Sequence, residues 1–71
     1  MGFDQKGLWE LEQLVRARTH YRVKGLGVAL QDGRIVVNGV VNSYHVKQLA
    51  QHGILDVLPN APLTNAIIVQ D

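Results

Sequence analysis

The chain has 71 residues, of which 46% are hydrophobic, and a formal net charge of +1 at pH 7. A sequence of this length forms one domain, and its apolar content and low charge argue against a disordered tail. The absence of cysteine excludes a disulfide framework and a thiolate zinc site. No apolar run approaches the ~20 residues that cross a bilayer, so we expect no transmembrane segment.

An apolar pattern near the N-terminus predicts the first helix. Leu8, Leu11 and Leu14 recur at helical spacing, with polar side chains between them. Asp4 precedes this pattern in the position of a helix N-cap. We therefore expect a helix over residues 5–18.

Trp9 lies on this predicted helix but away from its apolar stripe, about 100° from Leu8 around the helix axis. Two positions are open to such a side chain. It either flanks the core and is partly buried, which is the commoner outcome, or it contacts a membrane interface or a partner.

The second predicted element is a β-hairpin whose turn is formed by Asp32 and Gly33. An Asp-Gly pair between two alternating apolar runs is a strong hairpin signal, because both turn positions favour positive φ. A phosphate-binding loop is the alternative for this glycine-containing stretch. It is excluded because the Gly-Lys-Ser/Thr ending of such a loop is missing.

The predicted turn sets the pairing of the two strands. It places Leu30 opposite Ile35 and Val28 opposite Val37, and strict alternation then places Lys24 opposite Val41. Six apolar residues share the face that the alternation assigns to the core: Leu26, Val28, Leu30, Ile35, Val37 and Val41.

Gly39 lies on the same predicted core face, opposite Leu26. A glycine in a strand is expected where another part of the chain comes close to the backbone, and here a helix packing on the sheet is the expected neighbour. Gly39 is therefore interpreted as a packing residue, as Asp32 and Gly33 are interpreted as turn residues.

The other face of the hairpin is also apolar, and we interpret it as a candidate interaction face. Two glycines, Gly25 and Gly27, flatten this face. Several valines on one face of a small sheet suggest a covered surface. A second copy of the chain, another domain, a protein partner or a lipid surface are the possible occupants. The residues assigned to this face are Val23, Ala29, Val36 and Val40.

A second helix is expected after the hairpin, with Asn42 or Ser43 as its N-cap. Its apolar stripe has the spacing of a helix that packs on a sheet, and Pro59 ends it. A turn-rich loop and a short apolar strand over residues 65–70 close the chain. The order α-β-β-α-β predicts an α+β domain in which two helices cover one face of a three-stranded sheet.

The stretch "VALQDGRIVVNGVVNSYHVKQLA" resembles the BON domain, a small module of bacterial osmotically induced periplasmic proteins, secretins and some mechanosensitive channels. The resemblance covers residues 23–69, and the loop at 59–65 departs from the family pattern. The residues that carry it are Asp32, Gly33, Ile35, Val37, Gly39, Val41, Ser43 and Ala50.

The resemblance implies a non-catalytic interaction module, associated with the bacterial envelope or with osmotic stress. Its partner is expected to be a phospholipid surface or a protein, with a homodimer as a further possibility. The N-terminus lacks the basic start and apolar run of a signal peptide. A whole gene product would then be cytoplasmic, and a mature or excised domain would be periplasmic or envelope-associated.

No group of residues predicts an enzyme, a metal site or a cofactor. His45 and His52 are seven positions apart on the predicted helix, which separates them by about 10.5 Å, too far for one zinc ion. Glu10 and Glu12 are two positions apart and point in different directions. Ser43 has a capping role and no histidine–acid pattern that would activate it.

A basic segment follows the first predicted helix. Its four cations lie within nine residues that contain no acid: Arg16, Arg18, Arg22 and Lys24. They are candidate contacts for anionic phospholipid, or for nucleic acid as the alternative function. The commoner explanation is favoured: cations at a helix C-terminus, followed by a strand edge protected by charge.

Overall fold

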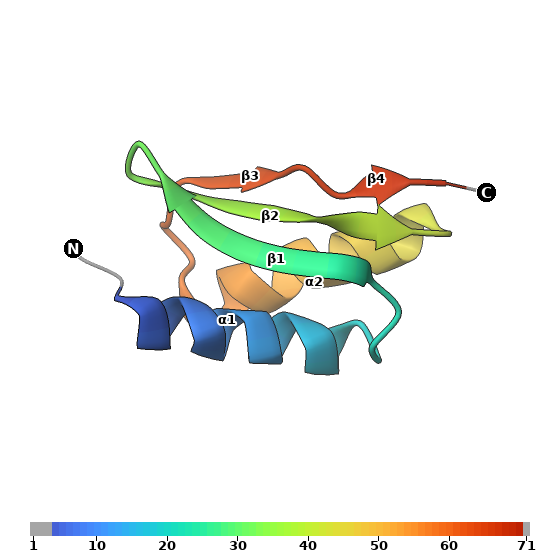
Figure 1. Cartoon of the computed structure of the whole chain (residues 1–71), viewed down its shortest axis with the longest axis horizontal. Helices are drawn as coiled ribbons and strands as arrows, with labels where there is room; N and C mark the ends of the chain where they lie inside the picture. The colour runs from blue at the N-terminus through green and yellow to red at the C-terminus, as the bar shows by residue number, and fades with distance from the viewer. Residues whose placement is uncertain (1–3, 71) are drawn as a thin grey trace.

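The computed structural model describes residues 4–70 of the chain. Two helices and four strands follow one another as α1, β1, β2, α2, β3 and β4 (Figure 1). Their bounds are α1 Gln5–Arg18, β1 Lys24–Gln31, β2 Arg34–Val41, α2 Tyr44–Val57, β3 Leu63–Asn65 and β4 Ile68–Val69.

Both helices begin and end where the sequence predicts. The Asp4 carboxylate accepts a hydrogen bond of 2.8 Å from the Gly7 amide and caps α1. Of the two candidate caps for α2, the structure selects Ser43, whose hydroxyl oxygen accepts a 3.2 Å hydrogen bond from the Val46 amide. Each cap supplies a partner for an amide that has no intrahelical acceptor.

The hairpin turn also forms as predicted. Asp32 has φ 50° and Gly33 has φ 78°, so both turn positions have positive φ. The strands pair antiparallel, with Val28 opposite Val37. The predicted pairing of Leu30 with Ile35 is confirmed as well, although Leu30 at the tip of the hairpin stays 39% exposed.

At the other end of the hairpin the predicted pairing is wrong. Lys24 lies opposite Val40 rather than Val41, because β1 contains a bulge between Lys24 and Gly27. Gly25 has φ +64°, a left-handed conformation that glycine adopts at little cost. The extra residue reverses the alternation of side chains in the part of the chain that precedes the bulge.

This reversal moves Val23 from the predicted interaction face into the core. Its side chain is 8% exposed and belongs to the buried cluster. The assignment of Val23 to the outward face is therefore wrong, and the cause is the bulge, which strict alternation does not anticipate. Lys24 moves in the opposite sense, to the side of the sheet that carries Val40.

Gly39 is a packing residue, but its neighbours differ from those expected. A β-carbon on Gly39 would collide with Val23 Cγ1 and would lie 3.2 Å from the carbonyl oxygen of Lys24. Its φ of +155° is also one that residues with side chains rarely adopt. The segment that comes close is thus the bulged start of β1, not a helix.

The last strand also differs from the prediction, since the sheet has four strands rather than three. Two short strands, β3 and β4, both pair parallel with β2, which makes the sheet mixed. Asn65 explains the interruption between them. Its side-chain oxygen accepts from the Ile67 amide at 3.2 Å, and its side-chain nitrogen donates to the Lys47 carbonyl of α2 at 3.0 Å.

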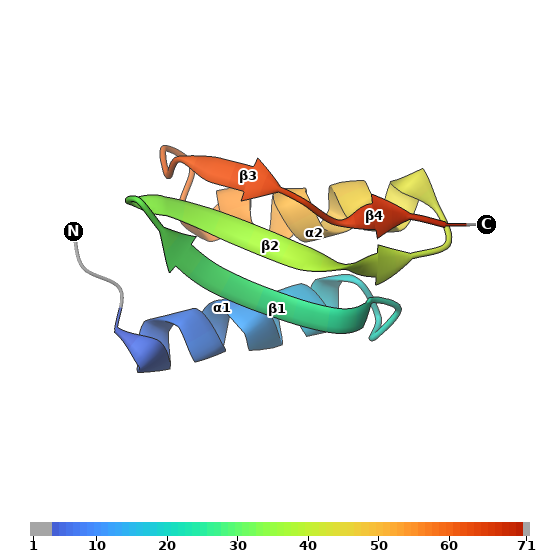
Figure 2. The same ribbon diagram turned by 45° about the horizontal axis from the view of Figure 1, so that its top comes forward.

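The two helices cover one face of the sheet, as expected, and the other face is open to solvent (Figures 1 and 2). The helix α1 packs against β1, and α2 packs against β2 and β4. The core between these layers consists of Leu11, Val15, Val23, Leu26, Ile35, Val37, Val41, Val46, Ala50, Ile54 and Ile67. The chain is thus a small α+β domain with the predicted order of helices and strands.

Candidate functional site

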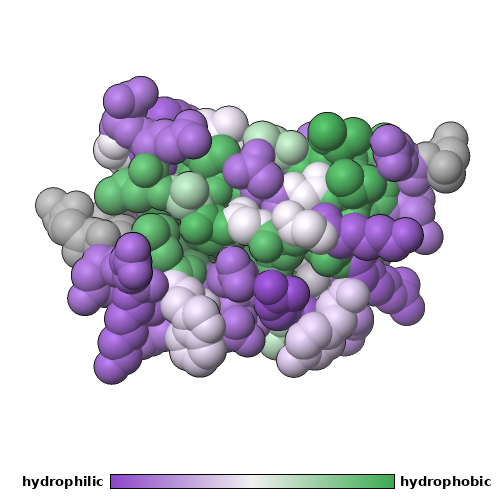
Figure 3. Space-filling model, viewed as in Figure 1, coloured by the Kyte–Doolittle hydropathy of each residue, from purple (hydrophilic) through white to green (hydrophobic). Residues whose placement is uncertain are grey.

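We call the solvent-facing side of the sheet the outer face. One row crosses three strands near the end of β2, where Lys24 lies opposite Val40 and Val40 lies beside Ile68. The Ile68 side chain is 57% exposed and Val40 is half-buried. In the side view of Figure 3, hydrophobic side chains lie over the strands toward both ends of the hairpin, and polar side chains lie between and around them.

A second row lies nearer the hairpin turn. Ala29 is opposite Val36, and Val36 is beside Thr64. Arg34 reaches across from β2 to β3, where its guanidinium donates to the Thr64 hydroxyl at 3.1 Å and to the Leu63 carbonyl at 3.2 Å. Three of the four predicted interaction residues, Ala29, Val36 and Val40, therefore share the outer face.

The structure separates the four cations of the basic segment into two pairs. Arg16 forms an ion pair of 3.1 Å with Glu12 on the same helix. Arg18 reaches α2 and forms an ion pair of 2.6 Å with Asp56. Within residues 4–70, Arg22 and Lys24 have no such acidic partner. Of the four cations in the basic segment, the two that are available to an anion therefore lie where β1 begins.

The loop between α1 and β1 holds this available charge in place. The amides of His20 and Tyr21 donate back to the carbonyls of Ala17 and Arg16, at 3.2 Å and 2.8 Å. This pair of bonds is a Schellman motif, which usually has glycine where His20 stands. His20 and Tyr21 instead have φ of 55° and 60°, so two non-glycine residues hold a left-handed conformation directly before Arg22.

Buried side-chain contacts support this conformation. Thr19 is 0% exposed, and its hydroxyl donates to the Val15 carbonyl at 2.7 Å. The aromatic ring of Tyr21, by contrast, is 74% exposed. The loop is thus fixed at its start and presents polar side chains to solvent at its end.

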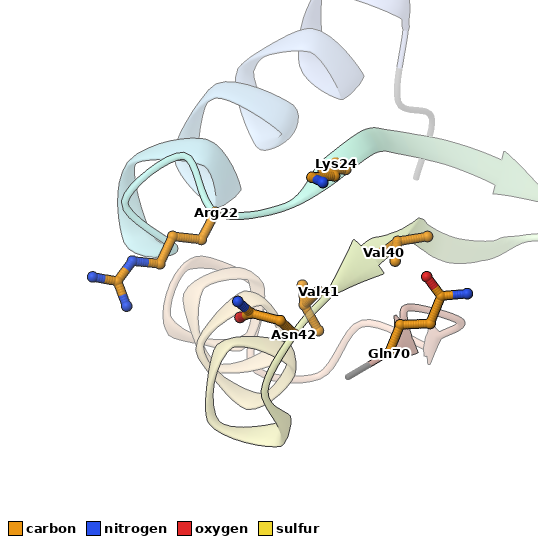
Figure 4. Close-up of a pocket in the computed structure, with 6 residues that line it drawn as sticks. All are labelled: Arg22, Lys24, Val40, Val41, Asn42 and Gln70. Atoms are coloured by element: carbon orange, nitrogen blue, oxygen red, sulfur yellow. The ribbon is translucent and has the colours of Figure 1, made fainter.

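Arg22 and Lys24 border a shallow hollow at the end of the sheet (Figure 4). Its other lining residues are the last two residues of β2, the residue that follows β2 and the residue that follows β4. They are Val40, Val41, Asn42 and Gln70. The sequence alone did not single out Gln70 or Ile68, and Asn42 was considered only as a helix cap.

The two histidines that were considered from the sequence as metal ligands both lie on α2. His45 and His52 are both exposed on α2, and no three potential metal ligands gather anywhere within residues 4–70. In that range every buried polar side-chain atom also has a hydrogen-bond partner.

Trp9 is 60% exposed. Of the two positions considered for this side chain, one that flanks the core and one that faces a partner or membrane, the structure therefore leaves most of the residue open to solvent.

Neither described helix is long and apolar enough to cross a membrane. A scan against protein-family models, a search of curated proteins and a search of solved structures found no match to the chain. The resemblance to the BON domain therefore rests on the quoted residues alone and stays a hypothesis.

Proposed function

We propose that this domain is a non-catalytic, BON-like interaction module that attaches to anionic phospholipid surfaces through the outer face of its sheet. The observation that carries the proposal is the row formed by Lys24, Val40 and Ile68. It joins a cation to the exposed Ile68 and the half-buried Val40 on one side of the molecule. A membrane interface offers both the apolar boundary and the negative charge that such a row can contact.

Charge favours a lipid surface over a second copy of the chain as the occupant. Lys24 lies near one end of the outer face and Arg34 near the other, and the helices cover the opposite side. Two copies that packed these faces together with the strands antiparallel would bring Lys24 of one copy close to Arg34 of the other. Like charges in an interface disfavour association, whereas an anionic membrane attracts the cation of the row, Lys24.

The expected attachment is weak and reversible. Each cation near an anionic membrane contributes about 1 kcal/mol. Burial of an exposed side chain such as Ile68 contributes up to about 2 kcal/mol more. Because a few such terms are comparable to the binding of a single lipid chain, we expect attachment that salt readily reverses.

The test is co-sedimentation with vesicles of phosphatidylglycerol and phosphatidylcholine, compared with pure phosphatidylcholine vesicles, at low and high salt. We expect binding to the anionic vesicles alone, with a loss at high salt. Lys24→Gln and Ile68→Thr should each weaken the binding. The matched controls Lys6→Gln and Val57→Thr change an exposed cation and an exposed valine on the helices, and they should bind normally.

Two results would contradict the lipid proposal. One is a failure to bind anionic vesicles at low salt. The other is a dimer, detected by light scattering, that dissociates on Ile68→Thr, because the outer face would then be occupied by a second copy. A soluble protein partner that competes with vesicles for this face would confirm that the outer face binds, but it would show that the partner is a protein rather than a lipid surface.

Nucleic acid binding by the basic segment is the weaker alternative. It needs several free cations along a backbone, and Arg16 and Arg18 are already paired with carboxylates. Two aromatic side chains of this segment, His20 and Tyr21, are exposed and could stack on a base, which is a short platform for a nucleic acid. A fluorescent RNA that binds more tightly than anionic vesicles at equal salt would favour this alternative.

A further inference from the structure

The hollow at the end of the sheet has the size of a site for a small group rather than for a large ligand. Its volume is about 240 Å³, and it lies where β2 and β4 end and β1 begins (Figure 4). Drug-sized ligands occupy pockets of about 300–1,000 Å³, whereas one water molecule takes about 30 Å³. A single tetrahedral anion with a few waters fits between these limits.

The charges around the hollow have one sign. Arg22 and Lys24 both line it, and no acidic side chain within residues 4–70 does. These are the two cations of the basic segment that have no acidic partner in the described range, unlike Arg16 and Arg18. Lys24 takes this position because the bulge turns it away from the core side of β1. The local field therefore favours an anion.

Neutral hydrogen-bond donors and a helix add to these charges. Asn42 and Gln70, whose side chains carry amides, line the hollow from two further segments (Figure 4). Asn42 is also followed directly by Ser43, the cap of α2, so the positive end of that helix dipole is close by. No acidic residue in the first turn of α2 offsets this dipole.

We propose that this hollow binds a phosphate group. The residues that line the hollow carry a guanidinium, an ammonium and two amides, and they come from separate segments (Figure 4). Such groups donate hydrogen bonds to the acceptor oxygens of an anion. The loop conformation held by His20 and Tyr21 keeps Arg22 beside the hollow before any ligand arrives. The site can accept inorganic phosphate, a soluble phosphate ester or the headgroup of a lipid.

This site adds to the proposed function without depending on it. Soluble phosphate can bind in the hollow even if the outer face attaches to no membrane. If the outer face does attach, Val40 and Lys24 belong to both surfaces, and the hollow would receive the phosphate of a headgroup at the edge of the contact.

The test is a titration of the isotope-labelled protein, observed by amide NMR shifts, with inorganic phosphate and with glycerol phosphate at constant ionic strength. Chloride is the reference anion. We expect saturable shifts for residues around the hollow, centred on Arg22, Lys24, Asn42 and Gln70. Arg22→Gln and Lys24→Gln should each weaken binding roughly threefold or more, and the double variant should abolish saturation.

Matched controls separate the site from general attraction to cations. Lys6→Gln and Lys47→Gln remove cations on the two helices and should leave the titration unchanged. Asp71 follows Gln70 in the sequence but lies outside the described residues, so Asp71→Asn is included. With an anion site, this variant binds phosphate equally well or more tightly, and weaker binding would overturn the proposal.

The outcome distinguishes this site from the membrane proposal. Saturable phosphate binding that disappears in the double variant supports the site, even if no vesicle binds. Vesicle binding by a protein whose shifts do not saturate with either phosphate compound would sink the site and leave the membrane proposal intact. Shifts spread evenly over Lys6, Arg34 and the hollow would also overturn it.

Discussion

The two ends of the β1–β2 hairpin differ in how regularly their side chains alternate between the two faces of the sheet. At the turn, Asp32 and Gly33 continue the strict alternation of the strands, and every predicted pair nearby is correct. At the opposite end a bulge at Gly25 reverses the alternation, so that Val23 enters the core and Lys24 faces solvent. The bulged end therefore carries the row of Lys24, Val40 and Ile68, whereas the turn end carries Arg34 and the partly exposed Leu30.

The comparison shows how one extra residue creates a surface. Without the bulge, alternation would direct Lys24 toward the core and Val23 toward solvent. With it, the buried cluster gains a valine and the row of Val40 and Ile68 gains a cation. Bulges are common next to functional sites because they redirect side chains in this way.

The largest expected effect comes from filling the space at Gly39. We expect Gly39→Ala to reduce the free energy of unfolding by about 3 kcal/mol, because the new methyl group meets Val23 and the backbone is strained. That is a large part of the roughly 4–10 kcal/mol that a domain of this size has. Denaturant unfolding measures the loss.

A double variant tests whether Val23 causes the effect at Gly39. Shortening Val23 to alanine removes the atom that the new methyl group would strike. The loss in Gly39→Ala/Val23→Ala should therefore be smaller than the sum of the two single losses. Additive losses would mean that Val23 does not lie over Gly39, and the proposed bulge geometry would be wrong.

The next effect separates the two faces of the sheet. Val23→Thr should cost about 1–2 kcal/mol, since it puts a hydroxyl into the buried cluster. Val36→Thr on the outer face should change stability by less than about 0.5 kcal/mol. Thermal unfolding of the two variants measures both values, and equal costs would contradict the inward placement of Val23.

A smaller effect concerns the bulge itself. Gly25→Ala should cost about 1 kcal/mol, because φ of +64° is unfavourable for alanine even though the space there is open. Gly27→Ala is the matched control: it has equally open surroundings and no left-handed φ. We expect it to be neutral or slightly stabilising in chemical denaturation. A reversed order would place the bulge at Gly27.

The smallest effect is expected in the loop before Arg22. His20→Gly should stabilise the fold by about 0.5 kcal/mol, because glycine suits the left-handed position of a Schellman motif. The same change should leave the phosphate titration unchanged, because the loop keeps the conformation that precedes Arg22. A loss of stability would contradict the left-handed conformation at His20.

Local signals in the sequence were sufficient for most of the fold. Asp4, Ser43 and Pro59 delimit the helices through capping and proline geometry, and the Asp32–Gly33 pair sets the turn, all within a few residues of chain. The bulge was not predictable in this way. Gly25 and Gly27 are both plausible positions for it in the sequence, and the structure distinguishes them by the left-handed φ of +64° at Gly25.

The candidate site was less predictable because distant segments form it. Ile68 becomes important through its parallel pairing with Val40, and the sequence contains no signal for that pairing. The same pairing brings Gln70, the residue after β4, next to Asn42, the residue after β2, at the hollow. The basic segment was visible in the sequence. The ion pair between Arg16 and Glu12 forms within one helix, whereas the pair between Arg18 and Asp56 exists only because the two helices pack together.

The most direct test is a map of amide and methyl NMR shifts when the protein meets anionic bicelles, with zwitterionic bicelles as the reference. We predict that the largest salt-sensitive changes fall on the bulged end, at Arg22, Lys24, Val40 and Ile68. Changes at the Asp32–Gly33 turn and on the exposed sides of α1 and α2 should be small. Changes centred on the helices, or on the turn, would contradict the assignment of binding to the bulged end of the sheet.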